Sequence, residues 1–263
     1  MSGVPEIDAL AVVLLVLAGL TAGWVDAVVG GGGLIQLPAL LLVPGISPVQ
    51  ALATNKVGSI MGTSTSAITY YRRVGPDLRT AAPMALAAFA AAVGGAAVAS
   101  RIPAALFTPV ILVVCIAVAV WTLARPKIGR KTDLRWEGHR HVGAALVVGL
   151  VIGAYDGVLG PGTGSFLVIA LVGVLGYAFL PASAIAKIVN FATNLGALVF
   201  FVPNGAVIWS LGLIVGGANL VGAYIGARMA VARGSAFVRV IFVVVVSALV
   251  VRLGWQTAGQ YWS

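Results

Sequence analysis

The sequence predicts an all-α polytopic membrane protein made of two inverted-topology repeats, with broken or half helices after glycine-rich motifs. Three observations lead to this prediction. The composition is strongly apolar, the two halves of the chain resemble each other, and each half carries a glycine-rich break inside apolar sequence.

The composition excludes an ordinary soluble domain. Of the 263 residues, 60% are hydrophobic and only 9% are charged, and the mean hydropathy is +1.08. Soluble domains carry roughly a quarter of charged residues, whereas a bilayer span needs about 20 apolar residues. The chain therefore has room for about eight to ten spans. No basic residue precedes Lys56, so we expect the first apolar window to be a retained span and not a cleaved signal peptide.

Apolar windows follow one another along the whole chain, and we expect them to be helical. The windows near 34–43 and 165–179 are short, because ten helical residues reach only about 15 Å, or half of a bilayer core. Both follow glycine-rich breaks, which predicts half-helices that either cross or re-enter the membrane. The remaining windows lie near 8–29, 48–70, 80–100, 104–124, 142–160, 182–202, 206–227 and 236–253.

The chain is also similar to itself over three separate segments. The matches are GWVDAVVGGGG with GAYDGVLGPGTG, ALATNK with ASAIAK, and GAAVASR with GAYIGAR. They align Asp26 with Asp156 and Lys56 with Lys187. Each half has five windows, an odd number, so the halves are inverted relative to each other if every window crosses.

The basic residues indicate topology and argue against a nucleic-acid surface. The net charge is +9, but most Lys and Arg residues concentrate in the stretches 72–79, 125–140 and 228–239. Short basic loops face the cytoplasm under the positive-inside rule. We therefore expect a first membrane repeat over 1–124, a basic cytoplasmic linker over 125–141 and a second membrane repeat over 142–263.

Four ionisable residues are embedded in apolar sequence: Asp26, Lys56, Asp156 and Lys187. Each costs at least about 2.5–3.5 kcal/mol inside a membrane, and repeat symmetry places all four. One interpretation is purely structural, with salt bridges inside each half or between the halves that fix helix register. The other is functional and places the four groups around a shared cavity at the repeat interface, with the two carboxylates as proton-coupling groups.

The glycine-rich breaks favour an anion site. Backbone N–H groups and the positive end of the helix dipole attract negative charge at a helix N-terminus. Two such ends facing each other would form an anion cradle, whereas a Walker-type phosphate loop is excluded because no GK[ST] follows. The alternative is plain flexibility or close packing. The break residues predicted to bind substrate are Gly31, Gly32, Gly33, Gly162, Thr163, Gly164 and Ser165.

Polar residues near the two lysines extend the predicted site. Lys187, Asn190 and Asn194 share one helical face, and Asn55 precedes Lys56. These amides could hold the oxygens of an anion or form hydrogen bonds between helices.

Two other groups of residues have simpler interpretations. Glycines four residues apart, as in 58/62, 149/153/157 and 222/226, are typical of helix packing in membranes. We expect His139 and His141, in the basic loop, to be solvated.

At these residues the sequence resembles the TauE/SafE sulfite exporter family of bacterial inner-membrane transporters. The motifs are GWVDAVVGGGGLIQLPALL, QALATNK, GAYDGVLGPGTGSF and GARMA, and the similarity covers nearly the whole chain. It implies a multi-pass inner-membrane transporter for small sulfur-containing anions such as sulfite, thiosulfate or sulfonates. Many relatives have more glycine where Pro161 and Thr163 stand.

The charges predict proton-coupled movement of the anion. With all four groups ionised the site is neutral, and protonation of one aspartate makes it positive. Burial in a low dielectric favours the protonated form of a carboxyl group. Alternating access would come from rocking one repeat against the other.

An anion channel, or a membrane protein whose buried charges are only structural, is the alternative. An enzyme is not expected, because there is no nucleophile–base pair: the one cysteine, Cys115, is isolated in an apolar run. We expect no cofactor and no metal. The expected partners are a small anion, protons and the lipid bilayer, with no nucleic acid, and the oligomeric state is left open.

Overall fold

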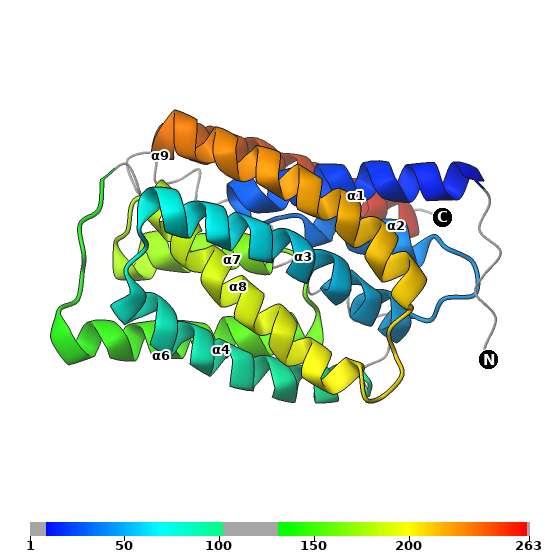
Figure 1. Cartoon of the computed structure of the whole chain (residues 1–263), viewed down its shortest axis with the longest axis horizontal. Helices are drawn as coiled ribbons and strands as arrows, with labels where there is room; N and C mark the ends of the chain where they lie inside the picture. The colour runs from blue at the N-terminus through cyan, green and yellow to red at the C-terminus, as the bar shows by residue number, and fades with distance from the viewer. Residues whose placement is uncertain (1–8, 102–130, 262–263) are drawn as a thin grey trace.

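The computed structural model describes residues 9–101 and 131–261, and every regular element in these ranges is helical (Figure 1). This confirms the predicted all-α class. The predicted helix at 104–124 and Cys115 lie outside the described residues. The elements are α1 (Ala9–Val29), α2 (Gly33–Leu41), α3 (Pro48–Val74), α4 (Leu78–Ala99), α6 (Gly138–Val158), α7 (Thr163–Ala170), the π-helical turn η2 (Leu171–Leu175), α8 (Phe179–Phe201) and α9 (Trp209–Tyr261).

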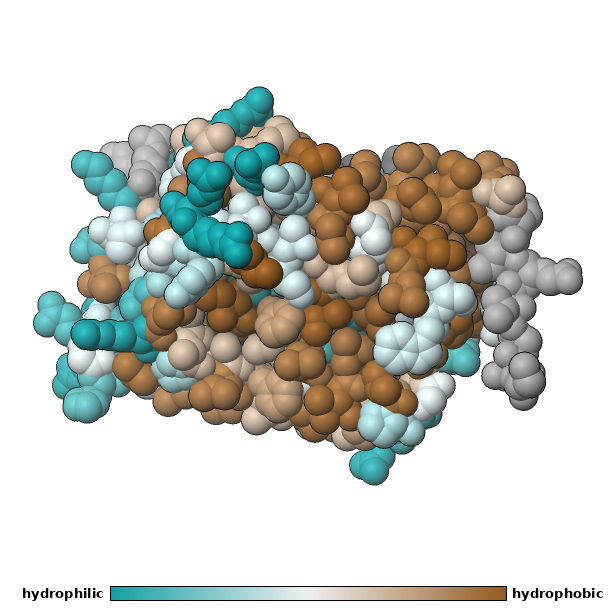
Figure 2. Space-filling model, in the orientation of Figure 1, coloured by the Kyte–Doolittle hydropathy of each residue, from teal (hydrophilic) through white to brown (hydrophobic). Residues whose placement is uncertain are grey.

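Four of these helices are long and apolar enough to cross a membrane, namely α1, α4, α6 and α8. Large apolar side chains such as Leu86, Val151 and Val240 are more than half exposed. Hydrophobic residues cover most of the face shown in Figure 2, and hydrophilic residues gather toward its left side. A surface of this kind suits a lipid environment, so the chain is a membrane protein.

The local sequence explains where the helices start and stop. Helix α3 begins with a capping box, in which the Ser47 hydroxyl accepts from Gln50 N at 3.2 Å and Gln50 Oε1 accepts from Ser47 N at 3.0 Å. It ends at Gly75, whose φ of 66° lies in the left-handed region. Helix α9 is kinked at Gly234, where φ is 75° and ψ is −171°. The kink separates the two apolar windows predicted near 206–227 and 236–253, which both lie within α9.

Each short helix turns back along the helix before it. Gly32 lies against Ala22 and Asp26 of α1, and Leu37 of α2 packs in one cluster with Leu15. Helix α7 turns back along α6 in the same way, and Trp136 Nε1, close to the start of α6, donates to Val174 O at 3.1 Å. In Figure 1 the two hairpins start from opposite ends of the molecule, α1 from the right and α6 from the left.

Glycines allow the longer helices to approach closely. Along the α4–α6 contact, a Cβ on Gly153 or Gly157 would collide with the backbone of α4, and a Cβ on Gly222 or Gly226 of α9 would collide with the backbone of α1. The prediction of helix packing is therefore confirmed for these positions. Helix α4 of the first half thus packs on α6, and α9 of the second half packs on α1.

A hydrogen-bonded cluster joins the α3–α4 turn, the start of α6 and the η2–α8 junction at one end of the bundle. The hydroxyl groups of Thr80 and Tyr177 each donate to Asp77 Oδ2 at 2.8 Å, and His141 Nε2 lies 2.9 Å from Thr80 Oγ1. Because both hydroxyl protons go to Asp77, the imidazole Nε2 is the donor to Thr80. Burial, helped by the hydrogen bond to Asp77, raises the pKa of Tyr177 to about 12.

The burial of His141 shows that one prediction was wrong. Its side chain is buried and packs edge-on against the ring of Tyr177, whereas His139 is exposed as predicted. The reason is that the linker packs against the η2–α8 junction. Asp133 N donates to Gly176 O at 2.8 Å, and at Gly176 any Cβ would collide with the Asp133 carbonyl.

Removal of the charge on Asp77 should destabilise the protein at neutral pH only. Burial opposes ionisation of Asp77, but hydrogen bonds from the Thr80 and Tyr177 hydroxyls and from the Arg79 backbone outweigh it and lower its pKa. Its contribution to stability is therefore present above the unfolded-state pKa and lost as the pH falls through the folded-state value. We expect Asp77→Asn to lower the free energy of unfolding by about 1 kcal/mol at most, since the carboxylate is solvent-exposed.

Thermal unfolding in detergent checks this prediction. The difference between wild type and Asp77→Asn should be present at neutral pH and shrink below about pH 4. Asp133→Asn is the control, because Asp133 is also exposed at this end of the bundle. The thermal midpoint of this control variant should equal that of the wild type at both pH values. An equal shift in both variants would contradict a specific role of the Asp77 charge.

Candidate functional site

Two buried ion pairs connect the halves of the chain at the centre of the bundle. Lys56 Nζ of α3 lies 2.7 Å from Asp156 Oδ2 of α6, and the two side chains are only 1% and 2% exposed. Lys187 Nζ of α8 lies 2.9 Å from Asp26 Oδ2 of α1, with exposures of 1% and 12%. Of the pairings that the sequence allowed, the structure has those between the halves.

Each ammonium group also reaches the backbone of its partner. Lys56 Nζ donates to Asp156 O at 2.8 Å, and Lys187 Nζ donates to Asp26 O. Asp156 has one more partner, because Thr163 Oγ1 donates to its Oδ1 at 2.5 Å. Hydrogen bonds of this kind compensate part of the cost of burying four charges.

The two glycine-rich breaks pack directly against each other beside the ion pairs. Gly30 has a φ of 85°, and a Cβ placed on it would collide with the backbone of Gly164. Ser165 joins the breaks, since its N–H donates to Gly30 O at 3.0 Å and its hydroxyl donates to Val29 O at 2.9 Å. Only glycine at both crossing points allows this approach, which brings the starts of α2 and α7 together.

A small cavity lies between the breaks and the ion pairs. Its volume is about 10 Å³, which is room for about one water molecule. In this conformation the site is therefore closed around its own charged side chains. The lining residues are Asp26, Gly30, Gly33, Asn55, Lys56, Ser59, Asp156, Gly160, Gly162, Thr163, Gly164, Asn190 and Asn194.

Most of the predicted site residues thus meet at one cavity, and four do not line it. Lys187 does not line the cavity but is paired with Asp26, which does. Gly31 packs near the side chains of Val25 and Ser165, and Gly32 packs directly on α1. Ser165 uses both of its donors to hold the breaks together.

A row of three hydrogen-bonded polar side chains, not predicted from the sequence, leads from α9 to the cavity. Asn219 Nδ2 donates to Gln36 Oε1 at 2.6 Å, and Gln36 Nε2 donates to Asn55 Oδ1 at 3.0 Å. All three side chains are buried. Gly58 and Gly62, expected to serve helix packing, leave room for the side chains of Gln36 and Asn219. The available signal was the isolated glutamine in the apolar stretch LIQLPAL.

The lining of the cavity carries one ammonium group, two carboxylates and three side-chain amides. Besides the ammonium of Lys56, the cavity has the amides of Asn55, Asn190 and Asn194. Asn190 and Asn194 are linked to each other, with Asn194 Nδ2 donating to Asn190 O at 2.8 Å. Within 9–101 and 131–261, no group of three or more His, Cys, Asp or Glu residues could hold a metal ion.

Comparison with known proteins gives the family of the chain. Residues 15–253 match the family model described as Sulfite exporter TauE/SafE. The chain belongs to this family. No solved structure matches the chain.

Relatives of this TauE/SafE protein are similar over nearly their full length. The chain is 38% identical to the probable membrane transporter protein ORF9 of Sinorhizobium sp, covering 91% of this chain and 90% of that protein. It is 31% identical to the probable membrane transporter protein YfcA of Escherichia coli K12, covering 94% and 91%. A probable membrane transporter protein of Haemophilus influenzae is 32% identical, covering 90% and 91%. Family and relatives together indicate a membrane transporter.

Proposed function

We propose that this TauE/SafE protein is a secondary transporter that moves small sulfur-containing anions, such as sulfite, thiosulfate or sulfonates, across the bacterial inner membrane in a proton-coupled manner. The observation that carries the proposal is the pair of lysine–aspartate bridges between the halves, placed beside one glycine-lined cavity. The family description, Sulfite exporter TauE/SafE, supports the substrate class.

The ion pairs suggest how anion and proton are coupled. An anion that enters the site competes with the carboxylates of Asp26 and Asp156 for the ammonium groups of Lys187 and Lys56. A carboxylate that loses its cation in a buried site carries a large desolvation cost. Uptake of a proton removes that cost. Each carboxylate displaced by the anion would thus bind one proton, and release of the anion would reform the ion pair.

The arrangement of the hairpins supports alternating access between inverted repeats. The hairpins α1–α2 and α6–α7 start from opposite ends of the molecule (Figure 1), as inverted halves require. Both ion pairs and the Gly30–Gly164 contact join one half to the other. Breaking these contacts would let the halves rock and open the closed cavity to one side at a time.

The basic stretches support an orientation in the inner membrane. The cluster of Asp77, His141 and Tyr177 joins the α3–α4 turn, the start of α6 next to the linker, and the η2–α8 junction. On α9, Ser235 Oγ accepts from Leu180 N at 3.0 Å. The stretches 72–79, 131–140 and 228–239 therefore lie at one end. We propose that this end faces the cytoplasm, under the positive-inside rule.

Counterflow in liposomes tests the proposal. Purified protein is reconstituted and loaded in turn with sulfite, thiosulfate, a sulfonate or a small carboxylate, and uptake of the labelled anion is followed at two pH values. We expect saturable counterflow of a sulfur-containing anion, with a pH dependence that Asp26→Asn/Asp156→Asn removes. A flux that neither saturates nor shows counterflow would indicate an anion channel. If no anion moved, the two lysine–aspartate pairs would have a structural role only.

A further inference from the structure

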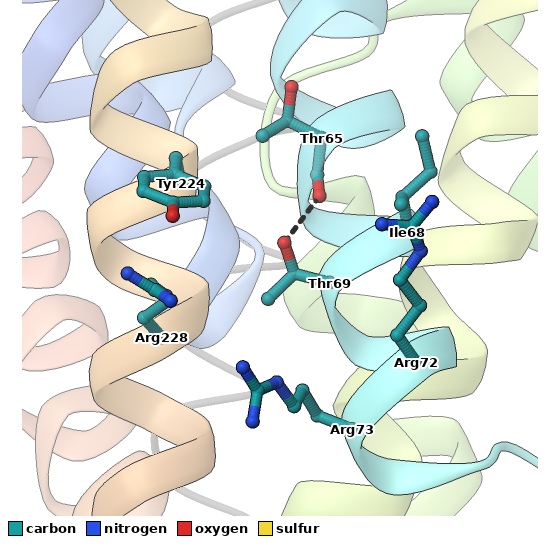
Figure 3. A pocket seen from close by; sticks show the side chains of 7 residues that line it. All are labelled: Thr65, Ile68, Thr69, Arg72, Arg73, Tyr224 and Arg228. Carbon is teal, nitrogen blue, oxygen red and sulfur yellow. Dashed lines mark hydrogen bonds between the residues drawn. The ribbon is translucent and has the colours of Figure 1, made fainter.

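A cleft of about 340 Å³ lies between α3 and α9, outside the ion-pair region (Figure 3). Arg72 and Arg73 come from the last turn of α3, and Arg228 comes from α9. In Figure 3, Arg73 projects from α3 into the gap between the helices, and Arg228 lies across from it. No residue of this cleft lines the cavity at the ion pairs.

The charge of the cleft is not balanced within the described residues. Among the described residues, the three arginines form no ion pair, and the buried carboxylates of Asp26 and Asp156 are paired with lysines instead. The guanidinium of Arg228 lies over the ring of Tyr224, 4.9 Å from its centroid, which holds it in place. Three guanidinium groups around a cleft match the oxygens of a phosphate group, because each offers a planar fork of donors.

The threonine hydroxyls of the cleft complement a ligand that carries hydroxyl groups. Thr65 Oγ1 donates to Met61 O at 3.0 Å, and Thr69 Oγ1 donates to Thr65 O at 2.8 Å. Their protons are thus used within α3, and their lone pairs remain free to accept hydrogen bonds. A phosphate oxygen cannot donate, but the hydroxyl of a glycerol headgroup can.

The surroundings of the cleft are apolar on the same two helices. Ile68 of α3 is 53% exposed, and Tyr224 and Ile225 of α9 are each 45% exposed. In Figure 2, hydrophilic residues over the left part of the molecule border directly on a hydrophobic surface. A basic pocket between membrane helices that opens next to an apolar surface can bind a lipid headgroup and its chains together.

We propose that this cleft binds an anionic glycerophospholipid, with the phosphate on Arg72, Arg73 and Arg228 and a headgroup hydroxyl on Thr65 or Thr69. Binding of this lipid does not depend on the transport proposal. The bound headgroup bridges α3 and α9, which belong to different halves of the chain, and so stabilises their junction at the end that carries the basic stretches.

Lipid titration of the full-length protein in detergent tests the proposal. Apparent dissociation constants come from the thermal midpoint as a function of phosphatidylglycerol or phosphatidylcholine concentration. Wild type should bind phosphatidylglycerol more tightly than phosphatidylcholine. Because a basic side chain near such a headgroup contributes about fivefold in affinity, Arg72→Gln/Arg73→Gln/Arg228→Gln should weaken phosphatidylglycerol binding by about 100-fold.

A matched control variant removes three positive charges outside the cleft, at the same end of the bundle. Arg79, Arg135 and Arg140 are exposed and do not line the cleft, so their replacement by glutamine should leave binding within about twofold. Equal weakening in both triple variants would mean unspecific attraction and would overturn the proposal. If the first triple variant does not fold, Arg228→Gln alone should still weaken binding by about fivefold, and an unchanged affinity would overturn the proposal.

Two further arms distinguish the ligand. Soluble glycerol 3-phosphate is titrated in place of lipid, and stabilisation equal to that by phosphatidylglycerol would overturn a lipid in favour of a free phosphate ester. Thr65→Val/Thr69→Val should weaken phosphatidylglycerol binding several-fold. Unchanged binding in that variant would overturn the role assigned to the hydroxyl groups.

Discussion

Lys56→Met should abolish transport and lower the free energy of unfolding by about 3–5 kcal/mol, because it leaves the Asp156 carboxylate buried without a cation. The Asp156 side chain is only 2% exposed and would keep a single side-chain donor, Thr163, at 2.5 Å. Methionine preserves most of the volume of the lysine stem, so the loss comes from the charge and not from a cavity. We expect the thermal midpoint in detergent to fall by about 10 °C and counterflow to disappear.

A second substitution separates stability from transport. Lys56→Met/Asp156→Asn removes the unpaired charge and keeps an oxygen that accepts from Thr163, so it should recover most of the midpoint without recovering counterflow. Lys131→Met, at an exposed position of the linker, is the control and should change neither quantity. Counterflow in the stable double variant would mean that this ion pair is structural and does not take part in anion binding.

The composition and the internal repeat were sufficient to predict the helical membrane fold and the groups that meet at its centre. Asp26 and Asp156 align in the repeat, as do Lys56 and Lys187, and the structure joins all four in two ion pairs. Which lysine pairs with which aspartate could not be predicted, because similarity between the halves does not say how they pack. The pairing follows from the contacts of α1 with α9 and of α6 with α4, which place each aspartate beside the other half.

The residues that were missed or misplaced depend on tertiary packing. Gln36 and Asn219 are single polar residues in apolar helices, and only the folded chain shows that Gly58 and Gly62 make room for them. His141 lies in a basic stretch, which on average is solvated. Its burial depends on the contact between the linker and Gly176, about 35 residues further along the chain, and no local pattern reports such a contact.

Gly30→Ala should be the most damaging replacement of a glycine by alanine near the site. An alanine at a φ of 85° costs about 1–2 kcal/mol, and its Cβ would collide with the backbone of Gly164, which cannot rotate away as a side chain could. Overpacking adds about 1–3 kcal/mol. We therefore expect the free energy of unfolding to fall by about 2–5 kcal/mol, measured from thermal unfolding in detergent, and counterflow to be lost with it.

Gly164→Ala approaches the same contact from the other half and should have a similar effect through the collision alone, since its Cβ would lie 2.5 Å from Gly30 Cα. Gly94 of α4 is the matched control, because a Cβ there meets nothing within 4 Å. Gly94→Ala should leave stability unchanged or raise it by up to about 1 kcal/mol through helix propensity. A loss of stability in Gly164→Ala but not in Gly94→Ala would show that close backbone packing, and not chain flexibility, requires the glycine at 164. If all three alanine variants unfolded like wild type, the two glycine-rich breaks would not cross in direct contact, and the cavity could not be closed in the way this structure has it.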